Sequence, residues 1–180
     1  MLTFFSTILI VNAINITDGL DGLASGMTTI ILVVLAIVTF LNHTYIATTV
    51  LGVCVAILIA FMFYNINPAQ IFMGDSGAFA LGGLIASTIY LLNMRIGILV
   101  PFAILFLLFI IELGSSAFQM GRKRLFKRKL FPIAPFHHYL EYKGLKEYTI
   151  VMKLWLIQAI LALITIVIIF GQYLQSDLIA

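Results

Sequence analysis

Two glycine-containing segments carry carboxylates in a chain that has few charged residues. The segment TDGLDG contains Asp18 and Asp21, each followed by a glycine, and the segment MGDSG contains Asp75. Magnesium in proteins prefers one or two carboxylates together with water and phosphate oxygens. Glycine lets backbone N–H groups approach a bound anion closely. These residues therefore favour a site in which Mg²⁺ and a phosphate-containing ligand are bound together.

A purely structural role is open for each of these carboxylates. Asparagine, aspartate and glycine form turns, and an aspartate can cap the helix expected from about residue 24. Asp75, at the start of another apolar segment, can equally be a capping residue that stabilises its helix by about 0.5–2 kcal/mol. An EF-hand is excluded for the first segment, because the twelfth position counted from Asp18 is Thr29 rather than glutamate.

Titratable side chains also occur further along the chain. His137 and His138 are adjacent in PFHHYLEYKG, and imidazoles near neutral pH can contact phosphate or move protons, or can simply lie on the surface. Adjacent positions do not share a helical face, so only one would be central in a helix. Glu112 and Gln119 are seven residues apart on one face of an apolar segment. An intramembrane glutamate indicates either a functional site or a hydrogen bond between helices.

The composition predicts an all-α polytopic membrane protein. Of the 180 residues, 63% are hydrophobic and 9% are charged, and the mean hydropathy is +1.17, whereas soluble globular proteins have about 25% charged residues. Crossing a bilayer takes about 20 helical residues. We therefore expect a single membrane domain over residues 1–180 with about six transmembrane helices, at 1–15, 24–41, 45–66, 77–93, 96–120 and 148–175.

Counting the crossings places three polar loops, 15–23, 65–76 and 121–147, at one membrane face. Eight of the ten basic residues lie between Arg122 and Lys146, and the positive-inside rule assigns that face to the cytoplasm. The carboxylates and histidines thus gather beside a basic loop, which suits phosphoryl transfer from a magnesium-bound substrate to a compound held in the membrane. We expect membrane lipids as partners and no nucleic acid.

Three segments carry a family resemblance: NAINITDGLDGLASG, NPAQIFMGDSGAFALGG and PFHHYLEYKG. In this order they resemble the polyprenyl-phosphate hexose-1-phosphate transferases and, within them, the phospho-N-acetylmuramoyl-pentapeptide transferases of bacterial cell-wall synthesis. The resemblance implies transfer of phospho-MurNAc-pentapeptide from UDP-MurNAc-pentapeptide to undecaprenyl phosphate, giving lipid I and UMP, with Mg²⁺ as cofactor. It also implies the bacterial inner membrane, an active face in the cytoplasm, and a homodimer.

The same resemblance implies roles for individual residues. Asp75 would be the magnesium ligand, and Asp75, His137 and His138 would be catalytic, with the histidines at the phosphate or sugar end. The substrate-binding residues would be Asn12, Asn15, Asp18, Asp21, Asn65 and Phe72. Phe72 would stack on uracil with Asn65 and Asp21 near the base, although the residues alone equally allow a core or lipid-facing phenylalanine and a helix-capping asparagine.

The departures from the family leave three functions open. Family members have about ten membrane helices, of which this chain corresponds to roughly the last six, without the Asp-Asp loop, and Tyr139 replaces a third histidine. The chain can be part of such an enzyme, active when the N-terminal helices are supplied by a partner. It can instead use UDP-N-acetylglucosamine as the donor. It can also be a non-catalytic membrane protein that binds uridine nucleotides.

Overall fold

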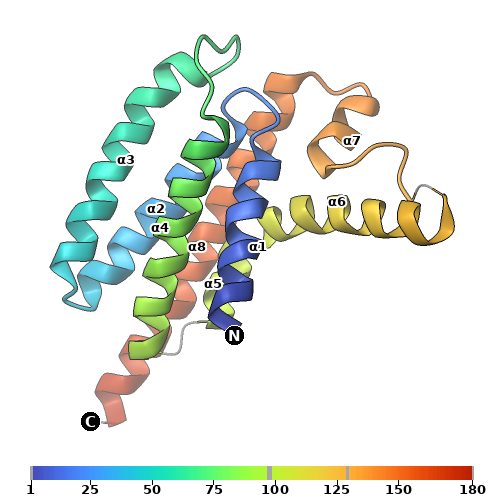
Figure 1. The fold of residues 1–180 in the computed structure, drawn as a ribbon. Coiled ribbons are helices and arrows are strands. Elements are labelled where there is room, and N and C mark those ends of the chain that lie inside the picture. The colour runs from blue at the N-terminus through green and yellow to red at the C-terminus, as the bar shows by residue number, and fades with distance from the viewer. Residues whose placement is uncertain (1, 97–98, 129, 180) are drawn as a thin grey trace.

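The computed structural model describes residues 2–96, 99–128 and 130–179, and this part of the chain is helical without strands. Its elements are α1 (Leu2–Thr17), α2 (Leu23–Leu41), α3 (Tyr45–Asn65), α4 (Gly74–Ile96), α5 (Leu99–Leu105), α6 (Leu107–Phe126), α7 (Phe136–Tyr142) and α8 (Glu147–Ile179). In the bundle α1 packs on α4, and α2 packs on both α3 and α8. Figure 1 shows α6 leaving the bundle almost at right angles to α1 and α4.

The expected all-α polytopic membrane protein is confirmed. Among the described residues four helical segments are long and apolar enough to cross a bilayer: Leu23–Leu41, Tyr45–Asn65, Gly74–Leu92 and Glu147–Gln175. A fifth apolar segment, Phe4–Thr17, is shorter. The α3 helix exposes apolar side chains such as Ile46, Ile57 and Phe63, as a lipid-facing helix does.

The segment expected as one helix over 96–120 is divided. The α5 helix ends at Leu105, and α6 begins at Leu107 in a different direction. Ending a helix inside a membrane leaves carbonyl groups that need a donor. The buried Gln158 of α8 supplies one, because its Nε2 donates to the Leu105 carbonyl over 2.9 Å. Thr165 of α8 donates similarly to the carbonyl of Pro101 at 3.2 Å.

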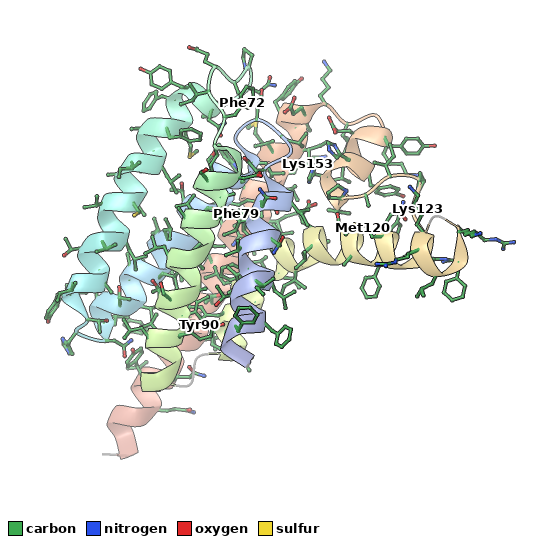
Figure 2. The ribbon with its side chains drawn as sticks, viewed as in Figure 1. Phe72, Phe79, Tyr90, Met120, Lys123 and Lys153 are labelled. Carbon is green, nitrogen blue, oxygen red and sulfur yellow. The ribbon has the colours of Figure 1, made fainter. Side chains whose placement is uncertain are left out.

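The outer part of α6 is basic as well as apolar. Arg122, Lys123 and Arg124 are exposed near its end, alongside the exposed Phe118 and Met120. Figure 2 shows Met120 and Lys123 on the part of α6 that extends beyond the bundle. Such a mixture of exposed aromatic and basic side chains suits the boundary between hydrocarbon and headgroups.

The polar loops lie together at one end of the bundle, as the crossing count predicts. The α1–α2 turn, the α3–α4 loop and the α7–α8 connection all lie at the same end in Figure 1. The α1 and α4 helices, which carry residues to this end, pack closely against each other. A Cβ on Gly82 of α4 would lie only 2.7 Å from the Cα of Val11 in α1, so the close approach requires glycine at this position. The third loop also contains a short helix, α7, that was expected only as loop.

Candidate functional site

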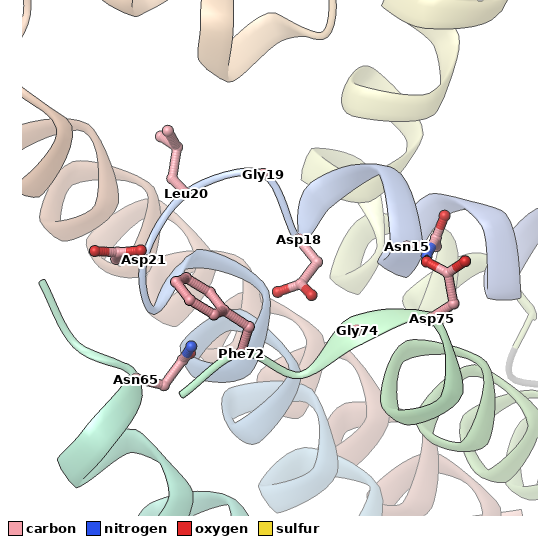
Figure 3. Close-up of a pocket in the computed structure, with 9 residues that line it drawn as sticks. All are labelled: Asn15, Asp18, Gly19, Leu20, Asp21, Asn65, Phe72, Gly74 and Asp75. Atoms are coloured by element: carbon pink, nitrogen blue, oxygen red, sulfur yellow. The ribbon is translucent and has the colours of Figure 1, made fainter. Parts of the chain in front are cut away.

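A cavity of about 300 Å³ opens at the end of the bundle where these loops meet. Its lining comes from the end of α1, the α1–α2 turn, the end of α3, the α3–α4 loop and the start of α4: Asn15, Asp18, Gly19, Leu20, Asp21, Asn65, Phe72, Gly74 and Asp75. Six of the nine residues proposed from the sequence are therefore brought together. Figure 3 shows Asn15 and Asp75 at one end, Asp21, Asn65 and Phe72 at the other, and Asp18 between them.

The first end of the cavity holds two carboxylates close to each other. The Nδ2 of Asn15 donates to Oδ1 of Asp75 over 2.8 Å, which links the end of α1 to the start of α4. Burial raises the pKa of Asp18 above its ordinary 3.8, and the charge of Asp75 raises it further. A hydrogen bond from the Gly74 backbone partly opposes this increase in the Asp18 pKa. A nearby cation would relieve the repulsion between the two carboxylates.

The chemistry of this donor set fits Mg²⁺. Among the described residues no three His, Cys, Asp or Glu side chains are grouped so as to hold a metal ion by themselves. Magnesium is commonly bound through one or two carboxylates, with the remaining positions taken by water and substrate phosphates. Asp75 and Asp18 supply that number of carboxylates beside an open cavity.

The second end of the cavity presents an exposed aromatic ring above a rigid support. Phe72 is 74% exposed although it is a large apolar side chain. Asn65 is buried beneath it, where its Nδ2 donates to the Ile71 carbonyl at 2.9 Å and its Oδ1 accepts from the Ser25 hydroxyl at 2.7 Å. Asn65 thus fixes the loop that carries Phe72 to α2. A ring held in this way can stack on a planar base.

Two side chains that sequence reasoning missed, those of Asn67 and Glu147, support Asp21. The Oδ2 of Asp21 accepts from Nδ2 of Asn67 at 3.1 Å and from the Ala69 N–H at 2.9 Å. Glu147 accepts from the Asp21 N–H at 2.7 Å. The sequence carries no distinctive signal for Glu147, because an acidic residue at the start of a helix is common for other reasons.

His137 lies behind the α1–α2 turn rather than in the cavity. It is fully buried, and Glu112 holds it by both oxygens: Oε1 accepts from the His137 N–H at 3.1 Å, and Oε2 contacts Nδ1 at 2.9 Å. Nε2 faces Gly19, has no hydrogen-bond partner among the described residues, and would overlap a Cβ placed there. Glu112 therefore joins α6 to α7.

The other proposed residues also lie outside the cavity lining. His138 is half-buried, with Nδ1 2.6 Å from Oε2 of Glu141 and its ring 4.4 Å from that of His137, measured between centroids. Asn12 is exposed on α1 and donates to the Ile8 carbonyl at 2.8 Å. Gln119, which the seven-residue spacing places on the same helix face as Glu112, instead binds the loop after α6. Its Nε2 donates to the Phe131 carbonyl, and its Oε1 accepts from the N–H groups of Leu130 and Phe131.

Comparison with known proteins gives the family. Residues 1–93, just over half of the chain, match the model of glycosyl transferase family 4. A phospho-N-acetylmuramoyl-pentapeptide-transferase of Bifidobacterium adolescentis is 37% identical over 92% of this chain and 49% of its own length. Proteins of the same name from Staphylococcus carnosus and Chlamydia felis are 37% and 39% identical, over 85% and 81% of this chain and 46% and 42% of theirs.

The chain thus spans about half the length of the curated relatives it matches. The family match covers every residue that lines the cavity, from Asn15 to Asp75. These findings agree with the resemblance of the sequence segments described above. The chain belongs to glycosyl transferase family 4.

Proposed function

We propose that this chain supplies the nucleotide-binding part of an enzyme that transfers phospho-MurNAc-pentapeptide from UDP-MurNAc-pentapeptide to undecaprenyl phosphate. The observation that carries the proposal is a single cavity with an exposed aromatic ring at one end and paired carboxylates at the other. That arrangement suits a uridine diphosphate group, which has a planar base at one end and charged phosphates at the other. We place this site at the cytoplasmic face of the bacterial inner membrane, because the neighbouring loop is strongly basic.

In this proposal the ends of the cavity have different tasks. Phe72 would stack on uracil, and Asp21, which lines the same end of the cavity, would lie beside the base. Asp75, oriented by Asn15, and Asp18 would hold Mg²⁺ beside the phosphates. Bound there, Mg²⁺ would neutralise phosphate charge as the diphosphate is cleaved. An oxygen of undecaprenyl phosphate bonds to the β-phosphorus, the bond from that phosphorus to the bridging oxygen breaks, and UMP leaves with the bridging oxygen.

The histidines have distinct places in this proposal. His138 is the more exposed of the pair and can reach a phosphate or sugar group at the edge of the site. His137 acts from behind, where its contacts with Glu112 and Gly19 fix the turn that carries Asp18 and Asp21. Homodimer formation, or a partner that supplies further helices, stays a prediction.

The test is uridine-nucleotide binding by the purified 180-residue chain in detergent, followed by UMP release. We expect UDP to bind in a Mg²⁺-dependent manner and Asp75→Asn to abolish this binding. CDP at the same concentration should not bind in the same way. Failure of the wild-type chain to bind UDP would contradict the nucleotide site. The chain is then supplied with undecaprenyl phosphate and UDP-MurNAc-pentapeptide, with or without added N-terminal helices. Release of UMP would support the proposed transferase activity.

The same experiment separates the alternative functions. Faster UMP release from UDP-N-acetylglucosamine than from UDP-MurNAc-pentapeptide would show that UDP-N-acetylglucosamine is the sugar donor. Saturable UDP binding without UMP release, even when the family's N-terminal helices are supplied, would favour a binding protein.

A further inference from the structure

Glu147 connects the two walls of the cavity from outside it. It is the first residue of α8, and its Oε1 accepts from the backbone N–H of Asp21 in the α1–α2 turn at 2.7 Å. Its Oε2 accepts from Nδ2 of Asn67 in the α3–α4 loop at 3.2 Å. One carboxylate thus binds two segments that are more than 40 residues apart in sequence and that meet only in the folded chain.

Asn67 completes the connection. Its Nδ2 also donates to Oδ2 of Asp21 at 3.1 Å, so the two N–H bonds of the amide can serve two carboxylates. The amide lies between the negative charges of Asp21 and Glu147 and gives each a donor. The Ala69 N–H donates to the same oxygen of Asp21 at 2.9 Å. Asp21 is therefore held by its backbone and by its side chain at once.

A second contact from α8 supports the same turn. Trp155 lies eight residues after Glu147, and its Nε1 donates to the Gly22 carbonyl at 3.2 Å. The indole packs against Gly26 so closely that a Cβ there would overlap the ring. The first turns of α8 thus hold the α1–α2 turn at Asp21 and at Gly22, and Glu147 also accepts a hydrogen bond from the α3–α4 loop.

We propose that Glu147 is a positioning residue for nucleotide binding: it sets the α1–α2 turn, which carries Asp18 and Asp21, at a fixed distance from the loop that carries Phe72. This inference rests on the proposed function, because it assumes that the cavity binds a uridine nucleotide. If Glu147 had only a local role, its negative charge would stabilise the N-terminus of α8 by interacting with the helix dipole, and nothing more. A positioning residue also controls the order of Ala69, whose N–H donates to Asp21, and the affinity for UDP.

The first measurement needs no nucleotide. Hydrogen exchange is followed at the Ala69 N–H in the wild-type chain and in Glu147→Ala, with the Asn42 N–H as an internal reference. The Asn42 N–H bonds to the Val38 carbonyl at the opposite end of the bundle. We expect exchange at Ala69 to become at least tenfold faster and exchange at Asn42 to stay unchanged. Unchanged exchange at Ala69 would overturn the positioning role, as would an equal acceleration at both sites, which indicates general unfolding.

The second measurement is a double-mutant cycle on UDP affinity with Glu147→Ala, Asn67→Ala and both together. Each single change should weaken UDP binding about tenfold, and the double change should weaken it little further, because both remove the same connection. Glu147→Gln, which keeps an acceptor for the Asp21 N–H, should recover part of the affinity. Asn42→Ala is the matched control and should bind UDP as the wild type does.

The outcomes distinguish this inference from the function on which it rests. If the wild-type chain binds no UDP, the proposed function fails, and hydrogen exchange at Ala69 alone decides whether Glu147 orders the loop. If the wild-type chain binds UDP and Glu147→Ala binds it equally well, the nucleotide site stands and the positioning role is refuted. Additive losses in the double variant also refute it, because they would mean that the two residues act separately.

Discussion

Replacing Gly19 by alanine tests how the α1–α2 turn packs on α7. A Cβ at this position would overlap Nε2 of His137 and lie 3.0 Å from Cε1 and 3.4 Å from Cδ2 of the same ring. The ring has little room to move, because it is fully buried and Glu112 holds both its Nδ1 and its backbone N–H. The added methyl must therefore displace either the turn or the histidine.

The magnitude follows from these two possibilities. Forcing an extra methyl into a packed site costs about 1–3 kcal/mol, and losing a hydrogen bond to a charged group costs about 1.5–3 kcal/mol. We expect the free energy of unfolding of Gly19→Ala to fall by about 2 kcal/mol. For a chain of this size that corresponds to a decrease in Tm of about 4–8 °C. Because Gly19 lines the cavity, UDP affinity should fall as well.

Thermal unfolding in detergent measures the effect, with Gly83→Ala as the matched control. Apart from its chain neighbours and its own helix backbone, no described atom lies within 4 Å of a Cβ placed on Gly83, so alanine in this helical position should not lower Tm. In a His137→Ala background the substitution of Gly19 should cost much less, because the obstructing ring is gone. Equal Tm values for Gly19→Ala and Gly83→Ala would refute the packing of His137 against the turn.

Three further substitutions test other contacts. Phe72→Ala should weaken UDP binding by about 10- to 100-fold and leave Tm unchanged, because the ring is mostly exposed; an unchanged Kd by titration calorimetry would remove it from the site. Asp18→Asn should raise Tm in EDTA, because the raised pKa of Asp18 makes its ionised form unfavourable in the folded chain. The wild type loses stability progressively as the pH rises from 3.8 through the raised pKa of Asp18, so the advantage of Asp18→Asn should grow over that interval; a pH-independent difference in Tm would contradict this cause. Gln158→Leu should lower the free energy of unfolding by about 1–3 kcal/mol, since it leaves the Leu105 carbonyl without its donor in the membrane; Tm equal to that of the wild type would show that the break needs no such donor.

Local composition was enough to predict most of the helices and the end of the molecule where the site lies. Long apolar runs require helices in a bilayer, because their backbone groups have no other partners there. Counting the crossings then placed the loops around Asp18, Asp75 and His137 at one end, which the fold confirms. The glycine-flanked carboxylates were recognisable as site candidates from their types and spacing, whereas Phe72 was a candidate only through the family resemblance, and the cavity contains all of them.

Contacts between distant segments decided the rest. The break after Leu105 depends on a donor from Gln158, 53 residues later, so hydropathy alone predicts a continuous helix. His137 lies behind the turn because Glu112, 25 residues earlier, binds it.

Glu147 has no unusual local pattern, and its importance depends on Asp21 and Asn67 reaching it in the folded chain. The sequence by itself determined most of the segments that are apolar enough to cross a membrane, although not the division of 96–120, and which polar residues share an end, because these follow from the local balance of apolar and charged side chains. Only the tertiary structure decided which of those residues face the cavity and which hold it in place, because that depends on hydrogen bonds and packing between elements far apart in the chain.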